Sequence, residues 1–189
     1  MNHWRGAGWL KGTRWALSPN QGARPVGGDV SLIVLHHISL PPENFSGDWI
    51  ERFFTNRLDS QAHPYFSSIA DLRVSAHFVV RRDGSVLQFV GCDRRAWHAG
   101  QSSWLGRANC NDYSVGIELE GSDSQPFTAA QYRALWGLVA KLRRRYPIVA
   151  IAGHCHVAPG RKTDPGPYFD WAALRARNPG LNLPSEVGG

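Results

Sequence analysis

Two histidines and an aspartate in this chain lie where buried strands are expected to end, and their side chains are of types that bind metal ions. The stretch GHCHVAPGRKTDPGP, residues 153–167, places His154 and Asp164 ten positions apart in a loop rich in proline and glycine. Proline fixes the backbone angle φ and glycine permits tight turns, so such a loop can hold both side chains toward one point. His36, at the end of the apolar run SLIVLHH, is the third candidate ligand.

Two imidazoles and one carboxylate leave the fourth position of a tetrahedral ion open to water, which is typical of a catalytic zinc. Zinc lowers the pKa of bound water to about 7. A nearby carboxylate can pass the proton to a leaving amine, and Glu118 and Glu120 in SVGIELEG share one face of their segment. The ammonium of Lys162 can stabilise an oxyanion. The residues therefore predict a metal-dependent hydrolase, and the choice between the two glutamates stays open.

Each of these residues also has an ordinary interpretation. The chain has 8 histidines, most of which we expect to be packed or exposed, and Asp-Pro-Gly is common in turns. His37 follows His36, and the period-two alternation of a strand lets only one of them face a metal. Cys155 and His156 follow His154 directly as alternative ligands, and we expect both to be bystanders.

The elements that position these residues are predicted from apolar patterning. Short β-prone runs predict strands over residues 31–37, 114–121 and 148–154, and a hairpin over residues 75–91 around the turn Asp83-Gly84. Thr128 and Gln131 form a potential capping box before an amphipathic helix that Pro147 ends, and residues 47–56 form a second helix. His36 and His154 thus lie at or near the ends of predicted strands, and Asp164 lies in the loop after the strand that ends at His154.

The length of 189 residues predicts one domain over residues 1–189, with its core at about residues 8–175. Residues 40–74 carry several prolines and aromatic residues between two predicted strands, and we expect them to form a lid or wall beside the site. Residues 179–189 are predicted to be a frayed tail.

The charge of +6 comes from basic residues spread along the chain, which argues against a nucleic-acid partner. Three cysteines are too few for a disulfide scaffold and fit a reducing compartment. The first residues, MNHWRGAGWLKGTRW, lack the apolar core of a signal peptide, and no segment has the length of a membrane span. We expect a cytoplasmic monomer without a membrane partner.

Five ordered motifs change the weight of these interpretations. HHISLPP, RVSAHFVVRRDG, RRAWHAG, CNDYSVGIELEG and GHCHVAPGRKTDPGP together resemble the AmpD-type 1,6-anhydro-N-acetylmuramoyl-L-alanine amidases of the zinc amidase and peptidoglycan-recognition-protein family. The resemblance covers residues 8–175. It implies an α/β fold of one domain, with a central mixed or mostly antiparallel β-sheet flanked by helices and a zinc groove at the strand ends.

The resemblance also implies roles for single residues. The zinc ligands fall on His36, His154 and Asp164, the catalytic glutamate on Glu118 and the catalytic lysine on Lys162. The implied reaction is hydrolysis of the amide between N-acetylmuramic acid and L-alanine in muropeptides, as part of cell-wall recycling and with an effect on β-lactamase induction. An amidase acting on intact peptidoglycan and a non-catalytic peptidoglycan-binding module are the alternatives.

Substrate-binding residues are predicted from chemistry that suits a muropeptide. Carboxylates of the stem peptide favour a positive groove, for which Arg73, Arg94 and Arg107 are candidates. Trp97 and His98 have flat rings with polar edges that suit a saccharide face. Tyr65, in the 40–74 segment, is a further candidate for substrate binding.

Overall fold

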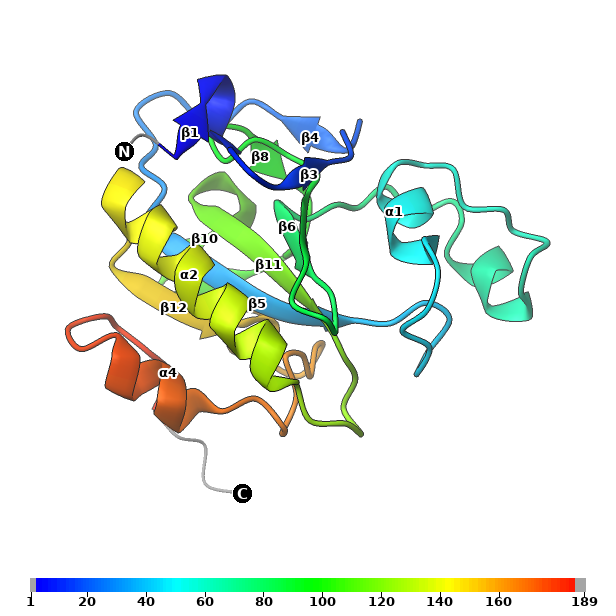
Figure 1. The fold of residues 1–189 in the computed structure, drawn as a ribbon. Coiled ribbons are helices and arrows are strands. Elements are labelled where there is room, and N and C mark those ends of the chain that lie inside the picture. The colour runs from blue at the N-terminus through cyan, green and yellow to red at the C-terminus, as the bar shows by residue number, and fades with distance from the viewer. Residues whose placement is uncertain (1–2, 186–189) are drawn as a thin grey trace.

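A six-stranded mixed β-sheet forms the centre of the molecule (Figure 1). The computed structural model describes residues 3–185. In spatial order the strands are β12 (Ala150–Gly153), β5 (Leu32–Ile38), β11 (Ser114–Glu120), β6 (Phe78–Val80), β7 (Val86–Gln88) and β3 (Arg14–Trp15). Neighbouring strands run parallel, except that β7 is antiparallel to β6. The predicted mixed sheet is confirmed, and the alternative of a mostly antiparallel sheet is wrong.

The first three strands in this order determine where the chemistry lies. β12, β5 and β11 are parallel, so their carboxyl ends meet at one edge of the sheet. All side chains of β11 are buried, as are those of β5 up to His36. Burial on both faces explains why β5 and β12 appear in the sequence as nearly continuous apolar runs.

Helices α2 (Ala129–Arg145) and α4 (Trp171–Arg177) cover one face of the sheet (Figure 1). The predicted capping box is present at the start of α2, where Thr128 Oγ1 accepts a hydrogen bond from the backbone N–H of Gln131 and the Gln131 side chain accepts one from the backbone N–H of Thr128. Leu135, Leu142 and other residues of the apolar stripe of α2 share one core with alternate residues of β5 and β11. The remaining residues of these strands, His36 and Glu118 among them, point to the opposite face.

The shorter elements surround this framework. The remaining helices are α1 (Trp49–Phe54), α3 (His154–Val157), and the 3₁₀ helices η1 (Gly6–Gly8), η2 (Pro64–Ser68) and η3 (Cys110–Asp112). Three small antiparallel sheets pair β1 (Trp4–Arg5) with β2 (Trp9–Leu10), β4 (Gln21–Gly22) with β8 (Arg95–Ala96), and β9 (Ser103–Trp104) with β10 (Arg107–Ala108). Within residues 3–185, no helix combines the length and the hydropathy that a membrane crossing requires.

The segment predicted to be a lid or wall projects from one side of the sheet with α1 and η2 (Figure 1). Three of its aromatic residues, Phe53, Phe54 and Phe66, are buried in a second core against β6 and β7. Near its start, the Glu43 carboxylate accepts hydrogen bonds of 2.8 Å from the hydroxyls of Ser122 and Ser124. The segment is therefore packed onto the domain as a wall.

The chain beyond α4 corrects the prediction of a frayed tail. The backbone N–H of Asn182 donates to the Val149 carbonyl at 2.9 Å, and the Asn182 carbonyl accepts from the Ile151 N–H at 3.0 Å. Leu183 is buried in the main core. Backbone pairing and one apolar anchor thus hold this part of the tail on the outer edge of β12, and residues 186–189 lie outside the described part of the chain.

Candidate active site

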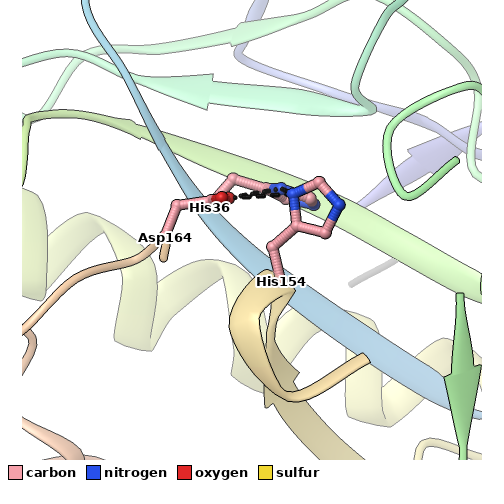
Figure 2. A group of neighbouring side chains, drawn as sticks. All are labelled: His36, His154 and Asp164. Atoms are coloured by element: carbon pink, nitrogen blue, oxygen red, sulfur yellow. Dashed lines mark hydrogen bonds and ion pairs between the residues drawn. The ribbon is translucent and has the colours of Figure 1, made fainter. Parts of the chain in front are cut away.

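His36, His154 and Asp164 meet at the carboxyl edge of the three parallel strands (Figure 2). His36 lies near the end of β5, His154 is the first residue of α3 directly after β12, and Asp164 lies in the following loop. His36 Nδ1 is 3.0 Å from His154 Nδ1, and Asp164 Oδ2 is 2.9 Å and 3.1 Å from these two nitrogens. The structure thus brings the three sequence-predicted ligands together, all of them buried.

The loop that carries Asp164 is held close to the end of β12. The Cys155 backbone N–H donates to the Asp164 carbonyl at 2.9 Å. A Cβ on Gly153 would lie 2.6 Å from Cδ of Pro165, so only glycine permits this approach without a shift. The short chain reversal between His154 and Asp164 therefore depends on the glycine that ends β12.

The electrostatics of the cluster suit a cation. Burial lowers the pKa of His36 to about 4, so its imidazole is neutral and available as a ligand near neutral pH. Burial alone would raise the pKa of Asp164, but the hydrogen bonds from His154 and His36 hold it well below its ordinary value. Two imidazoles and an ionised carboxylate with converging ligand atoms form a set that binds zinc and similar divalent ions.

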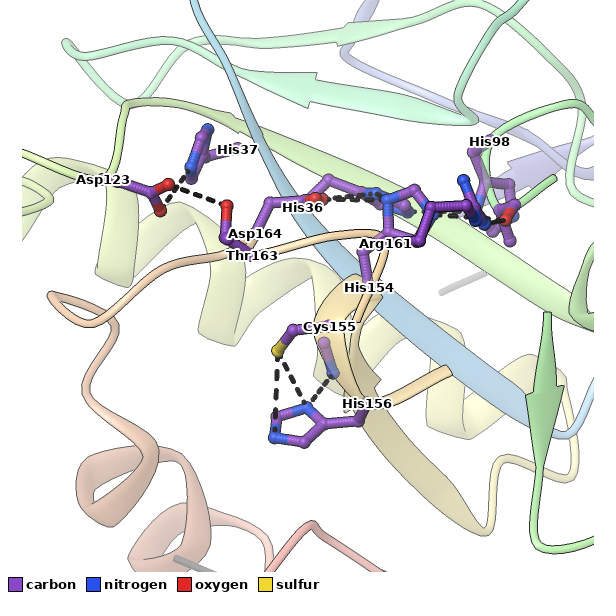
Figure 3. Close-up of polar contacts among 12 residues, drawn as sticks. His36, His37, His98, Asp123, His154, Cys155, His156, Arg161, Thr163 and Asp164 are labelled. Atoms are coloured by element: carbon purple, nitrogen blue, oxygen red, sulfur yellow. Dashed lines mark hydrogen bonds and ion pairs between the residues drawn. The ribbon is translucent and has the colours of Figure 1, made fainter. Parts of the chain in front are cut away.

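His37 lies outside the cluster, as the alternation of β5 requires. Its Nε2 is 3.0 Å from Asp123 Oδ1, and the other oxygen of Asp123 accepts a 2.7 Å hydrogen bond from the Thr163 hydroxyl (Figure 3). Asp123 therefore joins the end of β5 to the loop that carries Lys162 and Asp164. This role of Asp123 could not be predicted from the sequence, because Asp123 has no local motif around it.

Cys155 and His156 also lie apart from the cluster, because the chain turns into α3 instead of continuing β12. His156 Nδ1 accepts a 3.0 Å hydrogen bond from the Gly153 backbone N–H, and its ring contacts Trp171 edge-on. The Cys155 sulfur lies beside His156 (Figure 3). Neither side chain joins the three candidate ligands.

The two glutamates of β11 have different surroundings. Glu118 is 8% exposed, and its Oε2 has no hydrogen-bond partner among the described residues. Burial raises the pKa of Glu118 well above its ordinary value, Asp164 raises it further, and Lys162 opposes the shift. Glu120 instead pairs with Arg81 at 3.1 Å and accepts from the Arg82 backbone N–H at 2.9 Å. Glu118 is thus the carboxyl group available for proton transfer.

A cavity of about 460 Å³ joins the cluster to these groups. Glu118 and Lys162 line it together with the three candidate ligands. The wall formed by residues 40–74 contributes Leu40, Tyr65 and Leu72 to its lining. The buried carboxyl group, an ammonium and a potential metal site therefore share one space that is open to a small molecule.

Three of the residues predicted to bind substrate line this cavity, namely Tyr65, Trp97 and His98. The Tyr65 side chain is 39% exposed and the Trp97 side chain is half-buried, so both can contact a ligand. Both ring nitrogens of His98 already lie within hydrogen-bond distance of protein groups, at His36 and Ser114. Substrate binding by His98 therefore stays a prediction, and the ring also contacts a candidate metal ligand.

The predicted arginine contacts do not lie at this cavity in the structure. Arg73 lies between two residues that line it, but its guanidinium donates to the carbonyls of Ala70 and Leu72. Arg94 contacts Gln21. The Arg107 guanidinium lies 3.8 Å from the ring centroid of Tyr113 and borders a different pocket, so Arg107 does not line this cavity and its contact with substrate stays a prediction.

Comparisons with known proteins agree with this site. Residues 26–167 match the family described as N-acetylmuramoyl-L-alanine amidase. The chain is 54% identical over 171 residues to the 1,6-anhydro-N-acetylmuramyl-L-alanine amidase AmpD of Citrobacter freundii, covering 89% of this chain and 91% of that protein.

Solved structures show the same relationship. A crystal structure of a selenomethionine derivative of AmpD superposes with a TM-score of 0.89 at 52% identity, covering 92% of this chain and 98% of that one. The amidase AmiD of E. coli, solved with the substrate anhydro-N-acetylmuramic acid-L-Ala-D-γ-Glu-L-Lys, superposes with a TM-score of 0.60 at 29% identity, covering 82% and 58%. The chain thus shares its overall fold with these two amidases.

Proposed function

Because this chain belongs to the N-acetylmuramoyl-L-alanine amidase family, we propose that it hydrolyses the amide between the lactyl group of N-acetylmuramic acid and L-alanine in 1,6-anhydromuropeptides. The observation that carries the proposal is the unpartnered Glu118 carboxyl group in the same cavity as the His36, His154 and Asp164 cluster. The 54% identity to an amidase named for the 1,6-anhydro sugar supports this choice of substrate.

We propose zinc as the ion held by His36, His154 and Asp164, because two imidazoles and a carboxylate are a frequent ligand set for catalytic zinc. Bound zinc supplies a Lewis acid for the amide carbonyl and lowers the pKa of water toward 7. The cluster fits this ion, since three donor atoms from separate elements converge within about 3 Å of one another.

The protein's own groups then carry the proton and the charge. Glu118, as a carboxylate, accepts a proton from the attacking water and returns it to the nitrogen of the leaving L-alanine. Burial raises the pKa of Glu118, and a higher pKa makes its carboxylate a stronger proton acceptor. The Lys162 ammonium, on the rim of the cavity, stabilises the negative charge on the oxygen of the tetrahedral intermediate.

We further propose that the protein works in the cytoplasm on soluble fragments of the cell wall. All three cysteines are free, which agrees with a reducing compartment. Fractionation of cells that express the full chain, with a periplasmic marker enzyme as reference, tests this. Recovery with the periplasmic marker would contradict it.

The test of the proposed activity is mass spectrometry of the products from two substrates. Purified protein is incubated separately with 1,6-anhydro-N-acetylmuramoyl-tripeptide and with intact peptidoglycan, in each case as isolated, after chelation, and after zinc is restored. Release of free tripeptide from the soluble fragment, lost on chelation and regained with zinc, is the expected result.

The other outcomes separate the alternatives. Efficient release of peptides from intact peptidoglycan, with little from the fragment, would indicate an enzyme that acts on the cell wall. Binding of the fragment without cleavage, by protein that carries zinc, would indicate a binding module and overturn the proposed activity.

A further inference from the structure

Both imidazoles of the candidate metal site are hydrogen-bonded, through their second ring nitrogen, to one two-residue segment. His36 Nε2 is 3.0 Å from His98 Nδ1, and His154 Nε2 is 3.2 Å from the Ala99 carbonyl oxygen (Figure 3). Residues 98 and 99 are adjacent in the chain, whereas the two ligands lie on separate elements. Residues 98 and 99 therefore contact both ligand rings at Nε2, the nitrogen that does not face the candidate metal site.

The hydrogen bonds around His98 form a chain with a defined direction. A metal at Nδ1 of His36 needs the lone pair of that nitrogen, so the ring proton lies on Nε2 and is donated to His98 Nδ1. His98 must then carry its own proton on Nε2, which lies 3.1 Å from the Ser114 hydroxyl oxygen. The neutral His98 ring can thus accept from His36 and donate to Ser114 at the same time.

The segment is itself fixed by side chains that have no contact with the cavity. The Asn111 side-chain oxygen accepts from the backbone N–H groups of His98 and Ala99, at 3.1 Å and 2.9 Å. The Arg161 guanidinium donates to the Ala99 carbonyl at 2.8 Å. These bonds hold the backbone that presents both acceptor groups to the ligand rings.

The strand beside the segment leaves room for the His98 ring. A Cβ on Gly116, in the middle of β11, would lie 2.5 Å from Cγ of His98 and 2.7 Å from its Nδ1. A glycine inside a buried strand marks a close approach by another group, and here that group is the imidazole. The lack of a side chain at Gly116 therefore provides the space that the His98 ring occupies against β11.

We propose that His98 is a positioning residue, which keeps the Nδ1 lone pair of His36 directed at the metal. The neighbouring Ala99 carbonyl does the same for His154, so one segment orients both imidazole ligands. This inference rests on the proposed function, because it presumes that His36 and His154 bind zinc. Partners of this kind typically contribute 10-fold to 100-fold to metal affinity.

The test measures zinc affinity by competition with a chromophoric chelator. His98→Phe keeps a ring but removes the acceptor, and we expect zinc to bind 10-fold to 100-fold more weakly. His98→Asn places an amide oxygen near the position of Nδ1, and we expect it to restore most of the affinity. His77→Gln is the matched control, because His77 is also buried and its ring centroid lies 5.8 Å from that of His98, yet it bonds to Gly116 and Arg94 instead of a ligand.

A spectroscopic measurement on the unaltered protein makes the test independent of whether a variant folds. In the zinc-loaded wild type, ¹⁵N NMR of the imidazoles should show His98 neutral, with its proton on Nε2. A proton on Nδ1, or a doubly protonated ring, would overturn the inference, as would zinc affinity in His98→Phe equal to that of the wild type. Wild-type protein that binds no zinc would instead overturn the proposed metal, so the two failures are distinguishable.

Discussion

Glu118 and His36 are register partners on neighbouring parallel strands, β11 and β5. The backbone hydrogen bonds between these strands set the separation of the proposed general base and a proposed metal ligand, and both side chains point to the face opposite α2. A shift of one residue would place Leu119 or Ile117 at this position, because side chains alternate between faces. The relative position of Glu118 and His36 is therefore set by the pairing of β11 with β5 more than by either side chain.

Replacing Glu118 with glutamine should reduce kcat by 10²-fold to 10⁴-fold, the usual contribution of a general base, and leave zinc binding unchanged. Steady-state kinetics and metal analysis of the purified variant provide the measurement. Glu120→Gln is the control, since Glu120 lies on the same strand but pairs with Arg81. The Glu120→Gln substitution should lower the melting temperature of the protein and leave kcat unchanged. Full activity of Glu118→Gln would contradict the assigned role.

Replacing Lys162 with methionine should reduce kcat by about 10²-fold to 10³-fold through loss of oxyanion stabilisation, with a smaller change in KM. Lys162 also favours the ionised form of Glu118, so its loss raises the pKa of that carboxyl group. The carboxylate form of Glu118 then appears only at higher pH. The acid limb of the plot of kcat against pH should therefore move to higher pH. Lys141→Met, on α2, is the control, and an unmoved acid limb in Lys162→Met would argue against this coupling.

Replacing Asp123 with alanine should weaken the attachment of the Lys162 and Asp164 loop to β5. His37 and Thr163 lose their shared acceptor, which is half-exposed, so we expect a loss of about 1 kcal/mol of stability. Zinc affinity should fall a few-fold because Asp164 is held less firmly. Denaturant unfolding and chelator competition measure the two effects. Asp93→Ala, which removes a surface carboxylate paired with Arg145, should leave zinc affinity unchanged.

Acid should destabilise the protein in part through His77. Burial, aided by the neighbouring Arg24 guanidinium, lowers the pKa of His77 to about 3, and the His98 ring also faces it. Between about pH 6.5 and 3 the unfolded chain binds a proton that folded His77 does not, so stability falls as the pH is lowered. The contribution of one residue is at most about 1.4 kcal/mol per pH unit.

Comparing wild type with His77→Gln isolates this term. Urea unfolding of the metal-free proteins across that pH window should give a shallower decline for the variant. Parallel curves would show that His77 takes up a proton in the folded state.

The ligand cluster could be predicted from the sequence because each residue follows a recognisable apolar strand or a stiff turn. The parallel order of β12, β5 and β11 then brings the strand ends together. The choice between Glu118 and Glu120 could not be made from spacing, since it depends on Arg81, which is 39 positions away from Glu120 along the chain. A local pattern does not reveal such a partner.

Other features left weaker signals or none. The acceptor for His154 is a backbone carbonyl, that of Ala99, which carries no side-chain signature. The one available signal for the role of His98 was Gly116, an isolated glycine inside a strand pattern. The contact between the Arg107 guanidinium and the Tyr113 ring could not be predicted from the sequence, because no local pattern shows that an aromatic ring holds this basic residue.

The pairing of Asn182 with Val149 and Ile151 has a consequence for how separate molecules meet. β12 is the outermost strand of the sheet, and an uncovered edge of this kind can add a strand from another chain. The Asn182 backbone occupies the N–H of Ile151 and the carbonyl of Val149, the groups through which such a strand would join. Asn182 therefore leaves these two backbone groups of the edge strand unavailable for pairing with a strand of another molecule.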